Sequence, residues 1–218
     1  MPTLSDRLAA IGFRVSTAGG GVPPPHGTAD IERTLLDAIA EIPLDPRLAS
    51  LVFTWIEVHG RYVIVEKLAK LAAAWTEDER LRLAWLPAVA AWAAERGSPK
   101  WRKLARKAPE PVTLFPRDVT ESAVVLKGSI PFLARKNFIV PEGSIRIRKP
   151  DVLSPAELAR MNRQYRNRYL YGPSWRADIV TAIESGATSP AEIVRRLGCS
   201  YEPAHRVFRE YALAAKAG

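Results

Sequence analysis

The sequence lacks features on which several classes of protein depend. Its 218 residues include one cysteine, Cys199, which excludes an internal disulfide framework and cannot by itself build a thiolate metal site. No uninterrupted apolar run approaches the ~20 residues that span a bilayer. The first ten residues carry Asp6 and Arg7, where a signal peptide would be apolar. We therefore expect a cytoplasmic protein that does not engage a membrane.

Signatures of catalysis and of cofactor binding are also missing. The three histidines, His26, His59 and His205, stand far apart without metal-ligand spacing. Neither a Gly-x-Ser-x-Gly elbow nor a Gly-x-Gly-x-x-Gly loop occurs. The acidic run 77–79 falls at a predicted helix start, where acidic residues favour the helix dipole. We expect no catalytic residue, no metal and no cofactor, and hence no enzyme.

What the chain has in excess is positive charge. It carries 32 Lys and Arg against 23 Asp and Glu, a net charge of +9. The excess is uneven: residues 1–60 hold four basic and seven acidic side chains, residues 61–150 eighteen and nine, and residues 151–218 ten and seven. An excess in the middle and C-terminal parts indicates a polyanion partner, most often nucleic acid, although a solvated surface also accounts for it.

The first half of the chain has the apolar spacing of helices. A short helix over 4–11 precedes a glycine- and proline-rich linker at 19–25, and helical spacing then continues from 28 to 107. Thr28 or Asp30 caps the first of these helices, and Thr76 opens another with a capping box. Gly60 is expected to end a helix in the left-handed conformation, and Pro87 to kink or split one. The five tryptophans of this half, at helical spacing, are predicted to be core residues: Trp55, Trp75, Trp85, Trp92 and Trp101.

A basic stretch ends this helical half. Its five cations could contact a nucleic-acid backbone, or lie on the solvated face of a last helix whose Trp101 packs inward. They are Lys100, Arg102, Lys103, Arg106 and Lys107.

The sequence pattern after residue 108 completes the prediction of a mainly α fold. Recurrent prolines between 109 and 150 predict a connector, and the alternation around Pro141 and Gly143 predicts a small β-hairpin with strands at 138–140 and 145–148. We expect four parts: an N-terminal helix and linker (1–27), a helical bundle or short solenoid (28–108), the connector (109–150) and a tri-helical helix-turn-helix domain (151–218).

The most specific pattern lies near the C-terminus. Ser174 and Ser189 are predicted to cap two helices, Gly198 to supply a turn, and Ser200 to cap a third helix at about 200–213. This order of helix caps and turn is typical of a helix-turn-helix. The residues expected to face inward from this last helix and its turn are Cys199, Ala204, Val207, Phe208 and Tyr211.

The outward residues of that last helix indicate on physical grounds that the protein binds DNA. A recognition helix enters the major groove with its N-terminal outward residues at base edges, and an arginine there can read guanine. The candidate DNA-binding residues are Arg176, Ser189, Arg195, Arg196, Ser200, Tyr201, Glu202, His205, Arg206 and Arg209. Tri-helical units also serve as protein-docking or packing modules, so docking stays open as an alternative.

The stretch Gly-Pro-Ser-Trp-Arg-Ala-Asp-Ile-Val (172–180), followed by Arg-Leu-Gly-Cys-Ser-Tyr-Glu-Pro-Ala-His-Arg-Val (196–207), supports a family resemblance. It resembles the winged-helix-type regulators that are antitoxins of nucleotidyltransferase toxins in type IV, abortive-infection-like toxin–antitoxin pairs. The resemblance implies an autorepressor of its own operon and a cognate toxin as partner. Little chain follows the recognition helix, so we expect the arginines of 160–168 or the stretch 100–107 to contact DNA in place of a wing.

Two functions of different class follow. The first is a sequence-specific regulator that binds double-stranded DNA, with the helical half available for a homodimer or a toxin. The second is a protein-binding adaptor that neutralises or scaffolds a partner protein through its helical domain, without specific DNA binding. An RNA-binding role rests on residues 100–107 alone.

Overall fold

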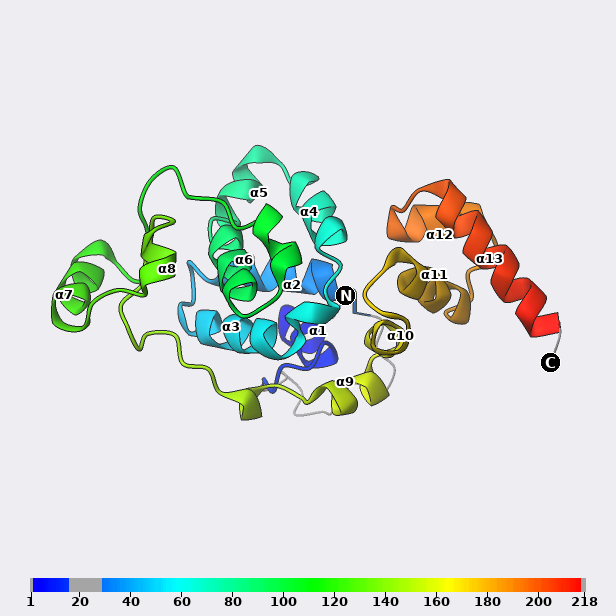
Figure 1. The fold of residues 1–218 in the computed structure, drawn as a ribbon, viewed down its shortest axis with the longest axis horizontal. Helices are drawn as coiled ribbons and strands as arrows, with labels where there is room; N and C mark the ends of the chain where they lie inside the picture. The colour runs from blue at the N-terminus through cyan, green and yellow to red at the C-terminus, as the bar shows by residue number, and fades with distance from the viewer. Residues whose placement is uncertain (1, 16–28, 217–218) are drawn as a thin grey trace.

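The computed structural model describes residues 2–15 and 29–216, and within these it is mainly helical with one two-stranded sheet. The expected mainly α fold with a small β connector is confirmed. The molecule is elongated, with α7 (Arg117–Lys127) at one end and α13 (Tyr201–Lys216) at the other (Figure 1). The predicted linker, His26 and Thr28 lie outside the described residues. Across the described ranges, no helix has the length and apolar character to cross a membrane.

Helices from the N-terminal and middle parts of the chain make up the body of the molecule. In chain order its α-helical elements before the connector are α1 (Leu4–Ala10), α2 (Ile31–Glu41), α3 (Arg47–His59), α4 (Val65–Ala73), α5 (Glu77–Arg82) and α6 (Leu86–Glu95). Two 3-10 turns, η1 (Gly60–Tyr62) and η2 (Pro99–Lys103), follow α3 and α6. The split at Pro87 between α5 and α6 and the caps at Asp30 and Thr76 are as predicted.

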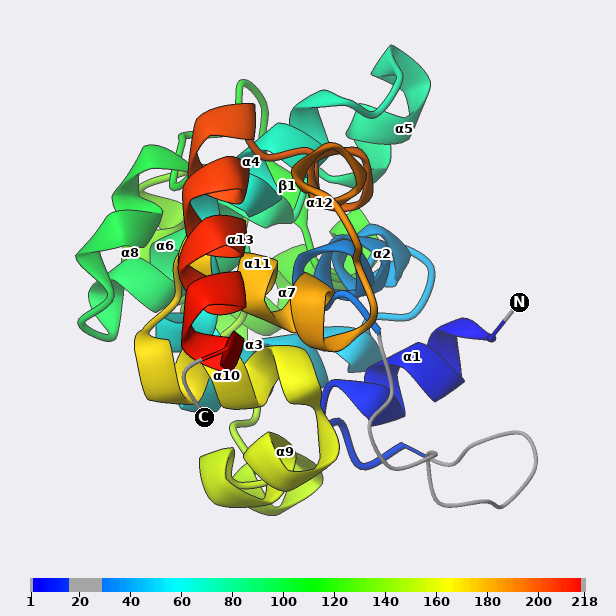
Figure 2. The ribbon, with the colours of Figure 1, turned by 90° about the vertical axis from the view of Figure 1, so that its right-hand side faces the viewer.

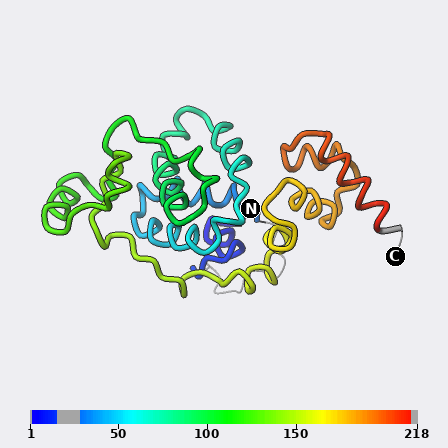
Figure 3. Tube along the Cα trace, in the orientation of Figure 1, coloured from blue at the N-terminus to red at the C-terminus, as the bar shows by residue number. Residues whose placement is uncertain are grey.

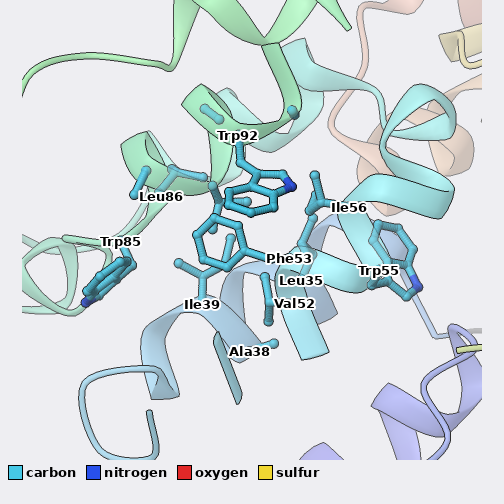
Figure 4. Close-up of a cluster of buried hydrophobic side chains, with 14 of the residues drawn as sticks. Leu35, Ala38, Ile39, Val52, Phe53, Trp55, Ile56, Trp85, Leu86 and Trp92 are labelled. Atoms are coloured by element: carbon cyan, nitrogen blue, oxygen red, sulfur yellow. The ribbon is translucent and has the colours of Figure 1, made fainter. Parts of the chain in front are cut away.

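A single large core holds the body together. Phe53 from α3 lies edge-on to Trp92 from α6, with ring centroids 4.9 Å apart (Figure 4). Trp55, Trp85 and Trp101 are also buried, and Trp75 packs partly buried against the same core, so the tryptophans are core residues as predicted. Burial of such large apolar surfaces is the main stabilising contribution here.

The connector was predicted with the wrong strand pairing. The sheet joins β1 (Val112–Thr113) to β2 (Phe138–Ile139) in parallel, whereas the residues 145–148 form no strand. The second segment of the expected hairpin instead sends Ile145 into the main core. Its backbone is fixed on α3, since the Arg148 amide donates to Thr54 Oγ1 at 3.2 Å. Tertiary packing therefore overrides the period-two pattern.

The prediction for Gly60 was also wrong. Its φ is −56°, in the right-handed helical region, because the chain continues directly into η1 rather than reversing. The basic stretch likewise forms no α-helix: residues 99–103 make the 3-10 turn η2, which presses Trp101 into the core.

The chain returns along the body before the C-terminal helices. It passes α8 (Pro131–Ala134), the turn η3 (Lys149–Asp151) and α9 (Pro155–Met161), running beneath the body to α10 (Arg163–Tyr171) (Figure 3). Ser154 and Glu157 form the predicted capping box of α9. Leu158 of α9 and Tyr165 of α10 belong to the main core, which therefore continues across the expected boundaries at 108 and 150.

A second, smaller core starts after α10. It lies between α11 (Trp175–Glu184), α12 (Pro190–Leu197) and α13, and includes Ile179, Ile193 and Val207. These three helices form the end of the molecule that faces the viewer in Figure 2, with α13 in front.

Candidate nucleic-acid interface

A helix cap and a glycine turn account for the local structure of the helix-turn-helix. The amide of Glu192 donates to Ser189 Oγ at 3.3 Å, which caps α12, and Pro190 occupies its first turn. Gly198 ends α12 with φ +68° and ψ 18°, and its amide donates to the Val194 carbonyl at 2.7 Å. This left-handed conformation is easy for glycine, so the turn predicted at Gly198 is confirmed. Ser200 is exposed directly before α13.

The inward face of α13 largely follows the prediction. Cys199, Ala204 and Val207 are buried in the second core, and Phe208 packs partly buried against it. Tyr211 was predicted inward but is 37% exposed. The helix runs on past the end of the three-helix unit (Figure 1), so its last turns have little to pack against.

The outward face contains every residue predicted for it. Tyr201, Glu202, His205, Arg206 and Arg209 are all exposed. The Tyr201 and His205 rings stack with centroids 5.9 Å apart and an interplanar angle of 19°. Arg206 and Glu202 approach only to 3.8 Å, so the guanidinium is loosely paired. Aromatic, imidazole and guanidinium groups thus share the N-terminal half of one open helix face.

The three flanking arginines have different surroundings. Arg195 of α12 is exposed, and among the described residues it has no ion pair. Arg196 forms a short ion pair with Glu192, and its guanidinium also reaches the Ser185 carbonyl at 3.4 Å. Arg176 pairs with Glu210 at 2.5 Å, which places it beside the second half of α13 rather than near Tyr201.

The basic stretch 100–107 divides in the structure. The ammonium of Lys100 donates to the Arg61 and Val63 carbonyls, both at 2.7 Å, and burial lowers its pKa from the ordinary lysine value. Lys100 therefore supports the junction between α3 and α4. The other four cations are exposed: Arg102, Lys103, Arg106 and Lys107.

A buried charge network, which sequence reasoning missed, joins the helix-turn-helix to the body. Arg168 of α10 is fully buried and donates to Glu32 of α2 at 2.5 and 2.7 Å and to Asp178 of α11 at two distances of 2.8 Å. Lys67 of α4 lies 2.8 Å from Asp178 and 3.1 Å from Glu32, and forms a short ion pair with Asp30. Elements far apart in sequence therefore share one set of charges.

The electrostatics of this network favour the ionised forms. Burial opposes ionisation of Lys67, but the surrounding carboxylates outweigh it and raise its pKa above the ordinary lysine value. Burial likewise opposes ionisation of Asp178, yet Arg168 and Lys67 lower its pKa. Two cations thus face three carboxylates, with the amide of Gln164 donating to Asp178 at 2.9 Å.

Three carboxylates of the network could in principle hold a cation. Oxygens of Asp30, Glu32 and Asp178 lie within 4.8 Å of one another. The Lys67 ammonium already lies among them, supplying the positive charge that a metal would bring. The network therefore acts as a structural joint between the body and α11.

Comparison with known proteins gives no independent assignment: no family model, no curated protein and no solved structure matches this chain.

Proposed function

We propose that the protein is a sequence-specific regulator that binds double-stranded DNA through α13. The observation that carries this proposal is the open N-terminal half of α13, where Tyr201, His205 and Arg206 are exposed on a capped helix-turn-helix. Such a half-helix can enter the major groove, with Arg206 donating to guanine O6 and N7. Arg195, Ser189 and Ser200 would contact the backbone beside it.

The position of α13 supports this use. It lies at one end of the molecule with its length open to the viewer in Figure 2, so the body stands behind it. The buried network holds α11, on which α13 packs, against the body. A helix in a groove needs such a fixed support, because backbone contacts set its orientation on the duplex.

A mobility-shift experiment with the DNA upstream of the protein's own operon tests the proposal. Replacing Arg206→Ala and Arg209→Ala should weaken binding at least about tenfold, since a good base contact contributes about 1–3 kcal/mol. Arg47→Ala with Arg117→Ala is the matched control, because both side chains are exposed on the body, at 91% and 84%. Wild-type affinity in the α13 variant would reject the recognition-helix assignment.

The antitoxin role is the finer part of this proposal. The regulator would repress its own operon and neutralise a nucleotidyltransferase-type toxin, as the family resemblance implies. Co-expression with the neighbouring gene tests it: relief of that product's toxicity is the expected result.

A second candidate, a protein-binding adaptor, is favoured by the apolar surface of α7. Val125 and Leu126 are 86% and 82% exposed there, whereas Thr120 is the buried residue of that helix. Co-purification of a partner whose binding is lost with Leu126→Asp, together with indifference to DNA at moderate salt, would favour the adaptor.

A further inference from the structure

A half-open groove on the body gathers positive charge from two separate segments. It has a volume of about 480 Å³ and lies between α6, η2 and the end of α8. Its apolar lining includes Ala91, Ala94 and Phe132, and its charged lining includes Arg102, Arg135 and Lys136. The sequence predictions included Arg102 within the basic stretch, but not the other two cations.

The two arginines of this groove are available to a ligand. Arg102 and Arg135 are exposed, and among the described residues neither forms an ion pair. One carboxylate, that of Glu95, also lines the groove, so the lining holds three cations against one anion. The residues that follow Arg102 in the sequence include three more exposed cations, which extend the positive surface beyond the groove: Lys103, Arg106 and Lys107.

The walls of the groove are fixed by hydrogen bonds to main-chain carbonyls. The Lys136 ammonium donates to the Ala105 carbonyl at 2.7 Å, and the Ala108 amide donates to the Lys136 carbonyl at 3.0 Å. Asn137 adds a side-chain bond to the Ala108 carbonyl at 2.7 Å. The two segments that supply the cations therefore keep a constant separation, as a preformed anion site requires.

The elements that line the groove lie on the same side of the molecule's long axis as α13. In Figure 2, which looks along that axis, α6, α8 and α13 lie on the left, whereas α1, α2 and α12 lie to the right. Figure 1 shows that α13 is separated from α6 and α8 along the same axis, so a duplex that contacts both must run along the length of the molecule.

We infer that this groove holds the phosphate backbone of the DNA that α13 binds. The inference rests on the proposed function and deepens it by assigning Arg102, Arg135 and Lys136 to phosphate contact. Guanidinium groups match phosphate geometry, and a basic surface longer than one phosphate suits a backbone better than a small anion.

Charge reversal in the full chain tests the inference. Arg102→Glu with Arg135→Glu is compared with Arg117→Glu and Lys127→Glu on α7. The α7 pair is exposed, lies outside the groove lining at the end of the molecule away from α13 (Figure 1), and changes the net charge equally. Affinity is measured for the upstream duplex and for a random-sequence duplex over a series of salt concentrations. The groove variant should bind both duplexes at least about tenfold more weakly, and its salt slope should fall by about 2, since each phosphate contact contributes about 0.9.

The outcomes separate this inference from the proposed function. Affinity and salt slope equal to those of the α7 control would overturn the groove assignment, while a loss of discrimination in the Arg206→Ala, Arg209→Ala variant would still support α13. A wild-type protein that does not discriminate between the duplexes, but loses affinity for both in the groove variant, would reject the sequence-specific regulator and retain the groove. Binding to neither duplex would reject both.

Folding of the variants is checked by thermal unfolding. Arg102→Ala with Arg135→Ala serves as the milder pair: it should show the same salt effect with a smaller loss of affinity, and an unchanged salt slope in a folded Ala pair would also overturn the assignment.

Discussion

His59 shows how a single buried side chain makes stability depend on pH. Its Nε2 lies 3.0 Å from the Leu153 carbonyl, which can only accept, so this nitrogen carries the proton. Its Nδ1 lies 2.8 Å from Tyr165 Oη and accepts from that hydroxyl. Both nitrogens of the neutral ring are thus satisfied inside the core.

Burial lowers the pKa of His59 from 6.5 to about 4, although the Leu153 carbonyl acts in the opposite direction. The unfolded chain therefore takes up a proton at a higher pH than the folded protein does. The contribution of neutral His59 to the free energy of unfolding is fully present above pH 6.5 and is lost as the pH falls from 6.5 towards 4. The loss at about pH 5 should be about 2 kcal/mol, since each pKa unit corresponds to about 1.4 kcal/mol.

Urea unfolding across this pH range measures the effect. The wild type should lose stability between about pH 7 and 5, a range above the ordinary titration of carboxylates. His59→Gln should be less stable at pH 7 but nearly independent of pH, because it removes the group whose pKa burial lowers. A wild-type midpoint that stays constant between about pH 7 and 5 would contradict the argument.

Among the elements, most predicted helix caps could be read from the sequence because caps are local; the exception is Ser174, which makes no side-chain capping bond at the start of α11. Asp30 and Ser189, and the box pairs Thr76–Glu79 and Ser154–Glu157, all make the capping bonds that their spacing predicts. Strand pairing in the connector is different. Val112 pairs with Phe138, which is distant in the sequence, and no local pattern near Pro141 could indicate that pairing.

Two glycines provide a matched test of what the turn requires. Gly198 has φ +68°, in the left-handed region, and nothing lies within 4 Å of the position that a Cβ would take there. Gly198→Ala should therefore destabilise the protein by about 1 kcal/mol through the backbone alone.

Gly60 is the control, since its φ is −56° and an added Cβ would meet Ile56 at an ordinary 3.4 Å. Gly60→Ala should be neutral or slightly stabilising because it reduces the entropy of the unfolded chain. Thermal unfolding of both variants checks the pair. Equal destabilisation would show that the left-handed backbone does not decide the cost at Gly198.

At the scale of the whole molecule, the outward face of α13 was accessible to sequence reasoning, but the charge network was not. Period and capping place Tyr201, His205 and Arg206 on one face without knowledge of any other element. Arg168, by contrast, was grouped with the arginines of 160–168, whose neighbours Arg160 and Arg166 are exposed. Its burial depends on its ion pairs with Glu32 and Asp178. Because Glu32 is far from Arg168 in the sequence, no local pattern indicates that these charges lie together.

The network makes Arg168 the residue on which the joint between body and helix-turn-helix depends. Arg168→Leu leaves Glu32 and Asp178 buried with Lys67 as their remaining cation. Breaking a buried ionic set in this way costs about 3–5 kcal/mol. Arg166→Leu is the control in the same helix: its ion pair with Glu184 is solvent-exposed, and losing it should cost under about 1 kcal/mol.

The pH dependence of that cost separates lost charge from lost packing. In Arg168→Leu the excess buried carboxylate has a raised pKa, so protonation relieves it as the pH falls. The difference in stability between variant and wild type should therefore be smaller at about pH 5 than at pH 7, whereas a pure packing defect would stay constant. Hydrogen exchange should locate the same change, with amides of α2, α10 and α11 losing protection together while those of α6 keep it. Loss confined to α10 would mean that the charges do not couple the helix-turn-helix to the body.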